Sequence, residues 1–117
     1  MKEPTDYLVR KISKKPNLTI LLALKSGSKK WSDLEKLLNK KYVYQGLKEL
    51  LNLGLIEVVI THDTPTGSKA YQLTPLGKKI VQHIEEIEKE FGEYHSQTPP
   101  KDPEKFIGEV IGGEGLD

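Results

Sequence analysis

The stretch that decides the fold is SDLEKLLNKKYVYQGLKELLNLGLIEVVI, residues 32–60 of a chain of 117. It opens with Ser32, and Glu35 follows three positions later, which is the spacing of a helix-capping box. A short helix is therefore predicted to begin at Ser32 and to end near Asn39. A second helix is predicted from Lys40 to Leu53 after a tight turn.

The helix predicted over residues 40–53 has two different faces. With 100° per residue, Val43, Leu47 and Leu50 fall on one side, which is the side expected to be buried. Gly46 lies at the edge of that side, where the missing side chain lets another backbone approach closely. Gly54 is placed to end the helix. The opposite face carries Lys41, Tyr44, Gln45, Lys48 and Asn52.

Two helices are predicted upstream of this pair. The first covers Pro4 to Ser13, with apolar residues at helical spacing. Asn17 is then expected to cap a helix that runs to Leu24 or Lys25. The residues of this second helix are apolar on nearly every side, so it should lie at the centre of the core. A brief extended stretch at Lys29–Trp31 follows.

A hairpin and a long helix are predicted downstream. Leu55–Thr61 alternates like a strand, His62–Lys69 has turn chemistry, and Ala70–Leu73 forms the returning strand. Thr74 and Pro75 then start a helix that reaches about Tyr94. This order predicts an α+β, mostly α, winged helix-turn-helix with two or three strands. We expect one domain over residues 1–95, including a dimerisation helix over 75–94, followed by a tail over 96–117.

The charge is divided unevenly along the chain. Residues 1–48 carry 12 basic and 4 acidic side chains, a net +8, whereas residues 49–84 carry 3 of each. Residues 85–117 carry 3 basic and 10 acidic side chains, a net −7. This pattern is typical of a basic half that faces a polyanion, although clustered surface charge would look the same.

The outer face of the helix over residues 40–53 suits DNA. Lysine neutralises phosphate or donates to guanine, glutamine pairs with adenine, and tyrosine bonds phosphate or packs on a thymine methyl. A solvated amphipathic helix would show a similar face, but the capped helix before it and the hairpin after it favour DNA. In the hairpin tip Lys69 is the only side chain that keeps a positive charge, and the negative charge of Asp63 opposes it. The hydroxyl groups of the tip can still form hydrogen bonds with phosphate. The candidate DNA-contacting residues are Ser32, Lys40, Lys41, Tyr42, Tyr44, Gln45, Lys48, Asn52, Thr66, Ser68 and Lys69.

Other kinds of site are not expected. The chain has no cysteine, which excludes disulfides and thiolate ligands, and its three histidines are widely spaced. Neither a phosphate-binding loop nor a nucleophile beside a base is present, so we expect no enzyme, no metal and no cofactor. No signal peptide or membrane span is visible, which indicates a cytoplasmic protein.

Several stretches resemble a known group of regulators. They are residues 18–24, Lys30–Leu34, Leu47–Ile56 with the ending L-x-x-L-x-x-x-G-L-I, and Tyr71–Gly77 with Y-x-L-T-x-x-G. The pattern is similar to the HxlR, MarR and PadR-like winged-helix regulators of bacteria and archaea, and it covers about residues 17–90. Within this group the chain resembles the archaeal type. Lys and Glu dominate the charges and Arg10 is the only arginine, which is typical of a thermophile with a lysine-rich proteome. The resemblance implies a dimer that binds DNA with the helix over residues 40–53 in the major groove.

The last predicted helix carries an apolar stripe. Leu76, Ile80, Ile84, Ile87 and Phe91 recur at intervals of three or four residues. The first part should close the core, and the later part should meet a second copy of the chain. The alternative is that the N-terminal helix covers the stripe within one chain. The candidate dimer residues are Tyr7, Leu8, Ile80, Ile84, Ile87 and Phe91.

The predicted function is a sequence-specific regulator of transcription, as a repressor, that binds double-stranded DNA as a homodimer. Two alternatives stay open, a winged helix used as a protein-interaction module and an architectural protein that coats DNA. The tail over residues 96–117 holds two apolar pairs, Phe106-Ile107 and Val110-Ile111. It is either disordered or an arm that docks on the domain or on the partner subunit, and it is a candidate for binding an unknown effector or protein partner.

Overall fold

The computed structural model describes residues 4–97. Nearly all of the predicted tail therefore lies outside the described residues, including both of its apolar pairs. The chain divides into two compact units, Met1–Ile84 and Glu85–Asp117.

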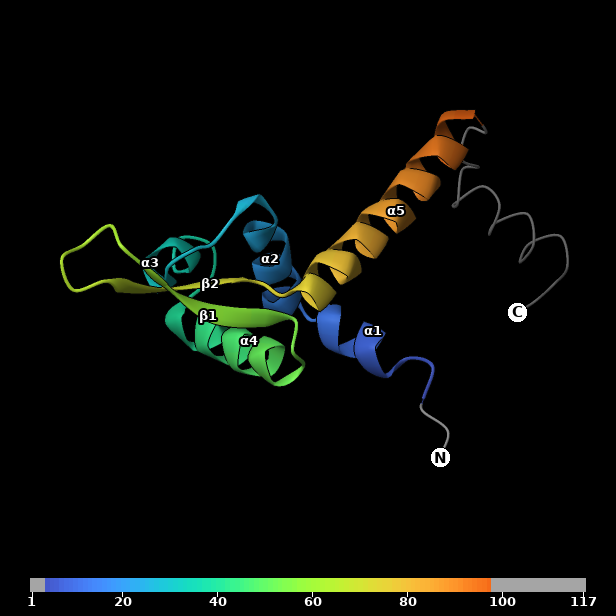
Figure 1. The fold of residues 1–117 in the computed structure, drawn as a ribbon. Helices are drawn as coiled ribbons and strands as arrows, with labels where there is room; N and C mark the ends of the chain where they lie inside the picture. The colour runs from blue at the N-terminus through green and yellow to red at the C-terminus, as the bar shows by residue number, and fades with distance from the viewer. Residues whose placement is uncertain (1–3, 98–117) are drawn as a thin grey trace, which may run out of the picture. The chain divides into compact units, whose positions relative to one another are not determined.

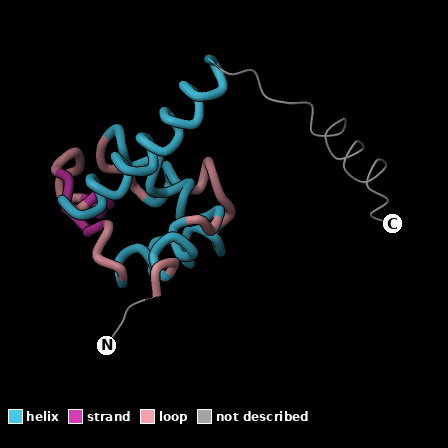
Figure 2. The backbone as a smooth tube through the Cα atoms, turned by 90° about the vertical axis from the view of Figure 1, so that its right-hand side faces the viewer, coloured by secondary structure: helices cyan, strands magenta, loops and turns pink. Residues whose placement is uncertain are grey.

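The order of elements confirms the predicted fold class. The helices are α1 (Tyr7–Ile12), α2 (Lys15–Ala23) with a 3-10 turn η1 (Leu24–Ser26), α3 (Trp31–Leu34), α4 (Lys40–Asn52) and α5 (Pro75–Gln97); the strands are β1 (Ile56–Thr61) and β2 (Ser68–Leu73) (Figure 1). Helices make up most of the described backbone, and within it the strands belong to one antiparallel hairpin (Figure 2).

The start of α2 differs from the prediction. The helix begins at Lys15, with Pro16 in its first turn, and Lys14 is its N-cap residue. Proline suits this position because its fixed φ is helical and its missing N–H needs no partner there. Asn17 is consequently not a cap. It is a buried residue inside the helix, and its Nδ2 donates to the carbonyl oxygen of Lys11 at 2.8 Å.

The start of α3 also differs. The predicted capping box of Ser32 and Glu35 is wrong, because the helix begins at Trp31 and Ser32 lies exposed within its first turn. The capping acid is Asp33, whose Oδ2 accepts the backbone N–H of Lys30 at 3.0 Å. The α-helix ends at Leu34, well before Asn39, and turns lead on to α4.

The second helix of the pair forms almost as predicted. The side chain of Asn39 caps α4 by accepting the N–H of Tyr42 at 3.0 Å. The core contains Val43, Leu47 and Leu50 from its inner face, together with Ile20 and Leu21 of α2. Gly46 is buried against α2, and a Cβ added there would lie 2.6 Å from Cδ1 of Ile20. The helices are closely packed at Gly46, but the tight contact is with the Ile20 side chain and not with the backbone as predicted, since the nearest backbone atom, the carbonyl carbon of Pro16, would lie 3.5 Å from the added Cβ. This packing fixes α4 against α2.

The hairpin is longer than predicted. The pairing runs from Ile56 opposite Leu73 to Thr61 opposite Ser68, so β2 begins two residues before Ala70. Lys29 adds an isolated bridge to Tyr71, with both backbone hydrogen bonds formed at 2.9 and 2.8 Å. The predicted extended stretch at Lys29–Trp31 thus supplies one bridge beside the two-stranded sheet, and its last residue, Trp31, begins α3 instead.

The first turn of α5 is anchored to the end of the helix-turn-helix. Thr74 accepts the N–H of Gly77 at 3.0 Å, and its own hydroxyl donates to the carbonyl oxygen of Gly54 at 2.7 Å. The predicted packing of Leu76 on the core is wrong, because that side chain is half exposed. Val81 is the buried residue instead, and Ile80 and Ile84 are partly buried beside the core.

Candidate nucleic-acid interface

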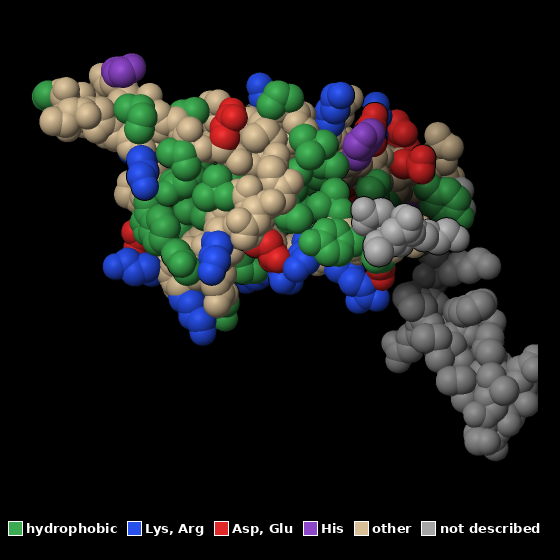
Figure 3. Space-filling model, turned by 60° about the horizontal axis from the view of Figure 1, so that its bottom comes forward, with side chains coloured by type: hydrophobic (Ala, Val, Ile, Leu, Met, Phe, Trp, Pro, Cys, Tyr) green, Lys and Arg blue, Asp and Glu red, His purple; other side chains and the backbone are tan. Residues whose placement is uncertain are grey.

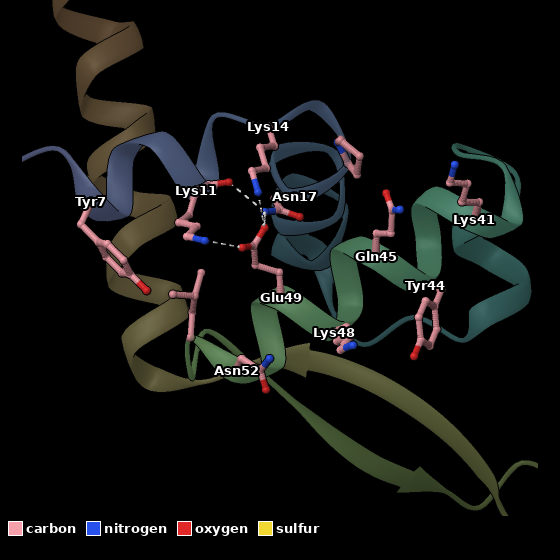
Figure 4. Close-up of a pocket in the computed structure, with 12 residues that line it drawn as sticks. Tyr7, Lys11, Lys14, Asn17, Lys41, Tyr44, Gln45, Lys48, Glu49 and Asn52 are labelled. Atoms are coloured by element: carbon pink, nitrogen blue, oxygen red, sulfur yellow. Dashed lines mark hydrogen bonds and ion pairs between the residues drawn. The ribbon is translucent and has the colours of Figure 1, made fainter.

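The exposed face of α4 forms one wall of an open groove. Its residues Lys41, Tyr44, Gln45, Lys48 and Asn52 all line the groove, which has a volume of about 730 Å³. The other wall is supplied by α1 with Tyr7 and Lys11, by the N-cap residue Lys14, and by the start of α2 (Figure 4). The structure therefore brings together the five residues that the helical wheel placed on one face.

A polar cluster joins the two walls of this groove. One carboxylate oxygen of Glu49 accepts from Nζ of Lys14 at 3.0 Å and from Nδ2 of Asn17 at 2.9 Å. The other carboxylate oxygen lies 2.9 Å from Nζ of Lys11. Figure 4 shows these side chains converging from α1, α2 and α4.

The charge of this cluster is fixed by its hydrogen bonds. The amide of Asn17, followed by the ammonium groups of Lys11 and Lys14, lowers the pKa of Glu49 to about 2. The same contact raises the pKa of Lys11, because the hydrogen bond with Glu49 favours its charged form. Glu49 is therefore ionised and Lys11 is charged near neutral pH.

The remaining lysines of the groove are held more loosely. Nζ of Lys48 lies 5.9 Å from the centre of the Tyr44 ring, a weak cation–π contact at an exposed site. Lys41 is exposed on the first turn of α4. Neither lysine forms an ion pair within the described part of the chain. Figure 3, which brings the lower side of Figure 1 forward, shows basic side chains along the lower edge with few acidic ones among them.

Three predicted DNA-contacting residues of α3 and α4 lie outside the groove lining. Ser32 is exposed on α3, and Lys40 is exposed at the first position of α4. Tyr42 lines a second hollow of about 500 Å³, together with Pro16 and Leu37. The structure thus places Tyr42 and Tyr44 in different hollows.

The hairpin tip holds the other predicted contacts. Thr66 and Lys69 are exposed, and the hydroxyl groups of Ser68 and Thr64 lie 3.3 Å apart. The prediction that Asp63 opposes Lys69 is wrong, since Asp63 forms an ion pair with Lys30. The contact with Lys30, followed by the hydroxyl of Thr61, lowers the pKa of Asp63 to about 2. Lys69 is thereby left as an exposed charge next to the tip.

The candidate dimer residues have different surroundings. In the first unit, Leu8, Ile80 and Ile84 are partly buried against the chain's own core, whereas Tyr7 is exposed and lines the groove. In the second unit, Ile87 and Phe91 are 66% and 63% exposed, and with Tyr94 they line a shallow hollow.

Four polar residues of the groove were not predicted from the sequence. In the sequence, Lys11 and Lys14 count only toward the charge of the basic half, Asn17 is expected to be a cap, and Glu49 is absent from the candidate residues of the helix over residues 40–53. The signal available for Lys11 and Lys14 was their spacing of three residues, which indicates a common side only if the chain stays helical between them. It does not, because α1 ends at Ile12.

The described residues show neither a metal cluster nor a membrane span. No group of three or more potential ligands among residues 4–97 is placed to hold a metal ion. In the same part of the chain, no helix combines the length and the apolar character needed to cross a bilayer.

The comparisons with known proteins place the chain in a family. A family model described as HxlR-like helix-turn-helix matches residues 11–99. No curated protein matches the chain in sequence.

Solved structures with the same fold include YodB from B. subtilis, a transcriptional regulator, with 20% identity and a TM-score of 0.63, covering 87% of this chain and 100% of that one. A MarR-family regulator from Enterococcus faecalis V583 has 21% identity and a TM-score of 0.64, covering 83% and 93%. The HTH-type transcriptional regulator ytcD has 23% identity and a TM-score of 0.65, covering 82% and 99%. The chain therefore belongs to the HxlR-like helix-turn-helix family, whose winged-helix members are DNA-binding regulators of transcription.

Proposed function

We propose that the chain recognises a specific sequence in double-stranded DNA, as a homodimer, with α4 in the major groove, and that it represses transcription. The observation that carries this proposal is the outer face of α4, where two lysines, a glutamine, a tyrosine and an asparagine lie exposed side by side. A major groove is wide enough to admit a helix with side chains of this kind.

The residues of this face divide by chemistry. Gln45 is the candidate for base discrimination, because its amide can donate to and accept from one adenine edge. Lys41 and Lys48 are the candidates for phosphate contacts, which position the helix without reading sequence. The wing adds Thr66, Ser68 and Lys69 as further candidates for the backbone.

The test begins by selecting bound duplexes from a random pool. On the selected operator, Gln45→Ala should relax the preference at one or two base positions and cost about 1–3 kcal/mol. Lys41→Ala and Lys48→Ala should weaken binding to all sequences and reduce the salt dependence by about 1 each. Lys79→Ala, an exposed lysine of α5, serves as the matched control.

The outcomes separate the candidate functions. Equal affinity for every duplex would indicate an architectural protein, and no binding at low salt would indicate a protein-interaction module. Unchanged operator affinity in the variant lacking Gln45, Lys41 and Lys48 together would refute the assigned reading face. A reporter with the operator over its promoter tests repression, since loss of the protein should then raise expression.

The homodimer is inferred from the second unit. Ile87, Phe91 and Tyr94 expose apolar surface at helical spacing, which is typical of a helix that packs on its own copy. Phe91→Asp should shift the sedimenting species toward the monomer, whereas Glu88→Gln on the same helix should leave it unchanged. A wild-type chain that is monomeric at all concentrations would refute the proposal.

A further inference from the structure

The groove that carries the proposed reading face contains an acid that opposes DNA. Among the described residues that line it, Glu49 is the only acid, facing the four lysines Lys11, Lys14, Lys41 and Lys48. A carboxylate at this place repels phosphate, and a DNA-binding face gains nothing from it by charge alone. The position of Glu49 therefore calls for a physical reason.

The contacts of Glu49 supply one. The carboxylate accepts three hydrogen bonds from α1 and α2, at 2.9 to 3.0 Å, and two of the three donors are ammonium groups. The Asn17 amide that holds it is buried and also binds the end of α1 through the carbonyl of Lys11. Because the same amide nitrogen of Asn17 donates to the carbonyl oxygen of Lys11 and to Glu49, the carboxylate is tied to the end of α1 and holds both lysines on the protein.

The lysines so held are reachable from solvent. The side chain of Lys14 is 55% exposed and that of Lys11 is 33% exposed, whereas that of Glu49 is 24% exposed. Without the carboxylate, each ammonium group would be free to rotate toward a phosphate on the same side as Lys48. Among residues 4–97, no acid is paired with Lys41 or Lys48, so the groove contains two lysines that are held by Glu49 and two that are not.

We infer that Glu49 determines specificity by withholding Lys11 and Lys14 from indiscriminate phosphate binding. This rests on the proposed function, since it concerns the same DNA face. Phosphate contacts strengthen binding to every duplex alike, whereas base contacts from Gln45 distinguish sequences. Limiting the number of lysines that reach phosphate keeps random DNA weakly bound and leaves a larger share of the affinity to base contacts.

The test is the salt dependence of binding to a random duplex, measured for Glu49→Gln and for the wild type. Each additional phosphate contact steepens the slope of log K against log salt by about 0.9, which corresponds to about 8-fold in affinity per tenfold change in salt. Glu49→Gln should steepen the slope by about 1 to 2. Glu57→Gln removes the same charge from the hairpin and should leave the slope unchanged.

A second pair of variants tests the same point without changing Glu49. In the wild-type background, Lys48→Ala should reduce the slope by about 0.9, whereas Lys14→Ala should leave it nearly unchanged. In the Glu49→Gln background, Lys14→Ala should reduce the slope by about 0.9. If Glu49 had only a structural role, Lys14→Ala would change the slope by the same amount in the wild-type and the Glu49→Gln backgrounds.

The outcomes are distinguishable. Equal slopes for the wild type and Glu49→Gln, or equal steepening by Glu57→Gln, would overturn this inference while the proposed function stands. Equal effects of Lys14→Ala and Lys48→Ala in the wild-type background would also overturn it. A wild type that binds no duplex even at low salt would refute the proposed function itself, and this inference with it.

Discussion

Gly77→Ala tests how α5 is joined to the domain. A Cβ added at Gly77 would lie 2.0 Å from the carbonyl oxygen of Leu55 and 3.0 Å from its carbonyl carbon. That oxygen cannot move aside easily, because it already accepts the N–H of Thr74 at 3.0 Å. The methyl group must therefore push the first turn of α5 away from Leu55.

The expected destabilisation follows from three terms. Forcing a methyl group into a close-packed contact costs about 1–3 kcal/mol. Displacing the first turn also weakens the bonds that Thr74 makes with Leu55 and Gly54, each worth about 1 kcal/mol. Alanine has the better helix propensity by about 1 kcal/mol, which offsets part of the loss. We expect Gly77→Ala to lower the free energy of unfolding by about 2–3 kcal/mol.

The assay is denaturant unfolding, with Gly92→Ala as the matched control. Both glycines lie in α5, but a Cβ at Gly92 would meet nothing within 4 Å. The control should gain about 0.5–1 kcal/mol from helix propensity alone. If the two variants are equally stable, or if Gly77→Ala is as stable as the wild type, the argument from close approach is refuted.

Two further predictions concern α4. Gly46→Ala should lower the free energy of unfolding by about 1–2 kcal/mol. Ile20→Val removes the Cδ1 atom that the new Cβ would meet, so the double variant should be more stable than the sum of the two single changes predicts. Strictly additive changes would contradict the contact. The ion cluster predicts a pH effect: the pKa of Glu49 is about 2 when folded and 4.5 in its ordinary range, so its contribution is present above pH 4.5 and is lost as pH falls toward 2. Because solvent around Lys14 screens the interaction, the free energy of unfolding should fall by about 1–2 kcal/mol between pH 4.5 and pH 2. Glu49→Gln should make the free energy of unfolding less dependent on pH over this interval.

The parts of the fold that the sequence predicted well are those with redundant local signals. In α4, the apolar residues at helical spacing and the glycine after the last turn indicate the same element, and the structure adds a cap at Asn39 that was not predicted from the sequence. Each signal alone would also suit other structures. Together they leave one arrangement, and the helix forms within one residue of the predicted bounds.

The starts of α2 and α3 were predicted less well, because several residues compete for the same role. Asn17 and Ser32 are both good caps, but each is preceded by residues that can start the helix earlier. Proline at position 16 favours the first turn, and Asp33 satisfies the backbone N–H of Lys30 from inside α3. The intrinsic preference of Asn17 or Ser32 for the N-cap position does not determine which of the neighbouring residues starts the helix.

The face of the candidate site was predictable, whereas its opposite wall was not. A wheel places Gln45 and Lys48 on the outside of α4 from their spacing alone. The contacts of Glu49 with Lys11 and Lys14 join residues 38 and 35 positions apart, and they depend on how α1 turns into α2 after Ile12. No local pattern contains that turn, so the cluster appears only in three dimensions.

These contacts also explain how a helix on a small domain can hold its outer side chains in defined directions. Gly46 fixes one point of α4 against α2, and Glu49, about one turn later, fixes a second against α1 and α2. Two fixed points on one side of a helix leave it no freedom to rotate about its axis. Gln45 and Lys48 each precede one of these points and are turned from it by about 100°, so their directions follow from the same two contacts. Changes at Gly46 should therefore alter operator affinity as well as stability, even though Gly46 itself cannot reach DNA.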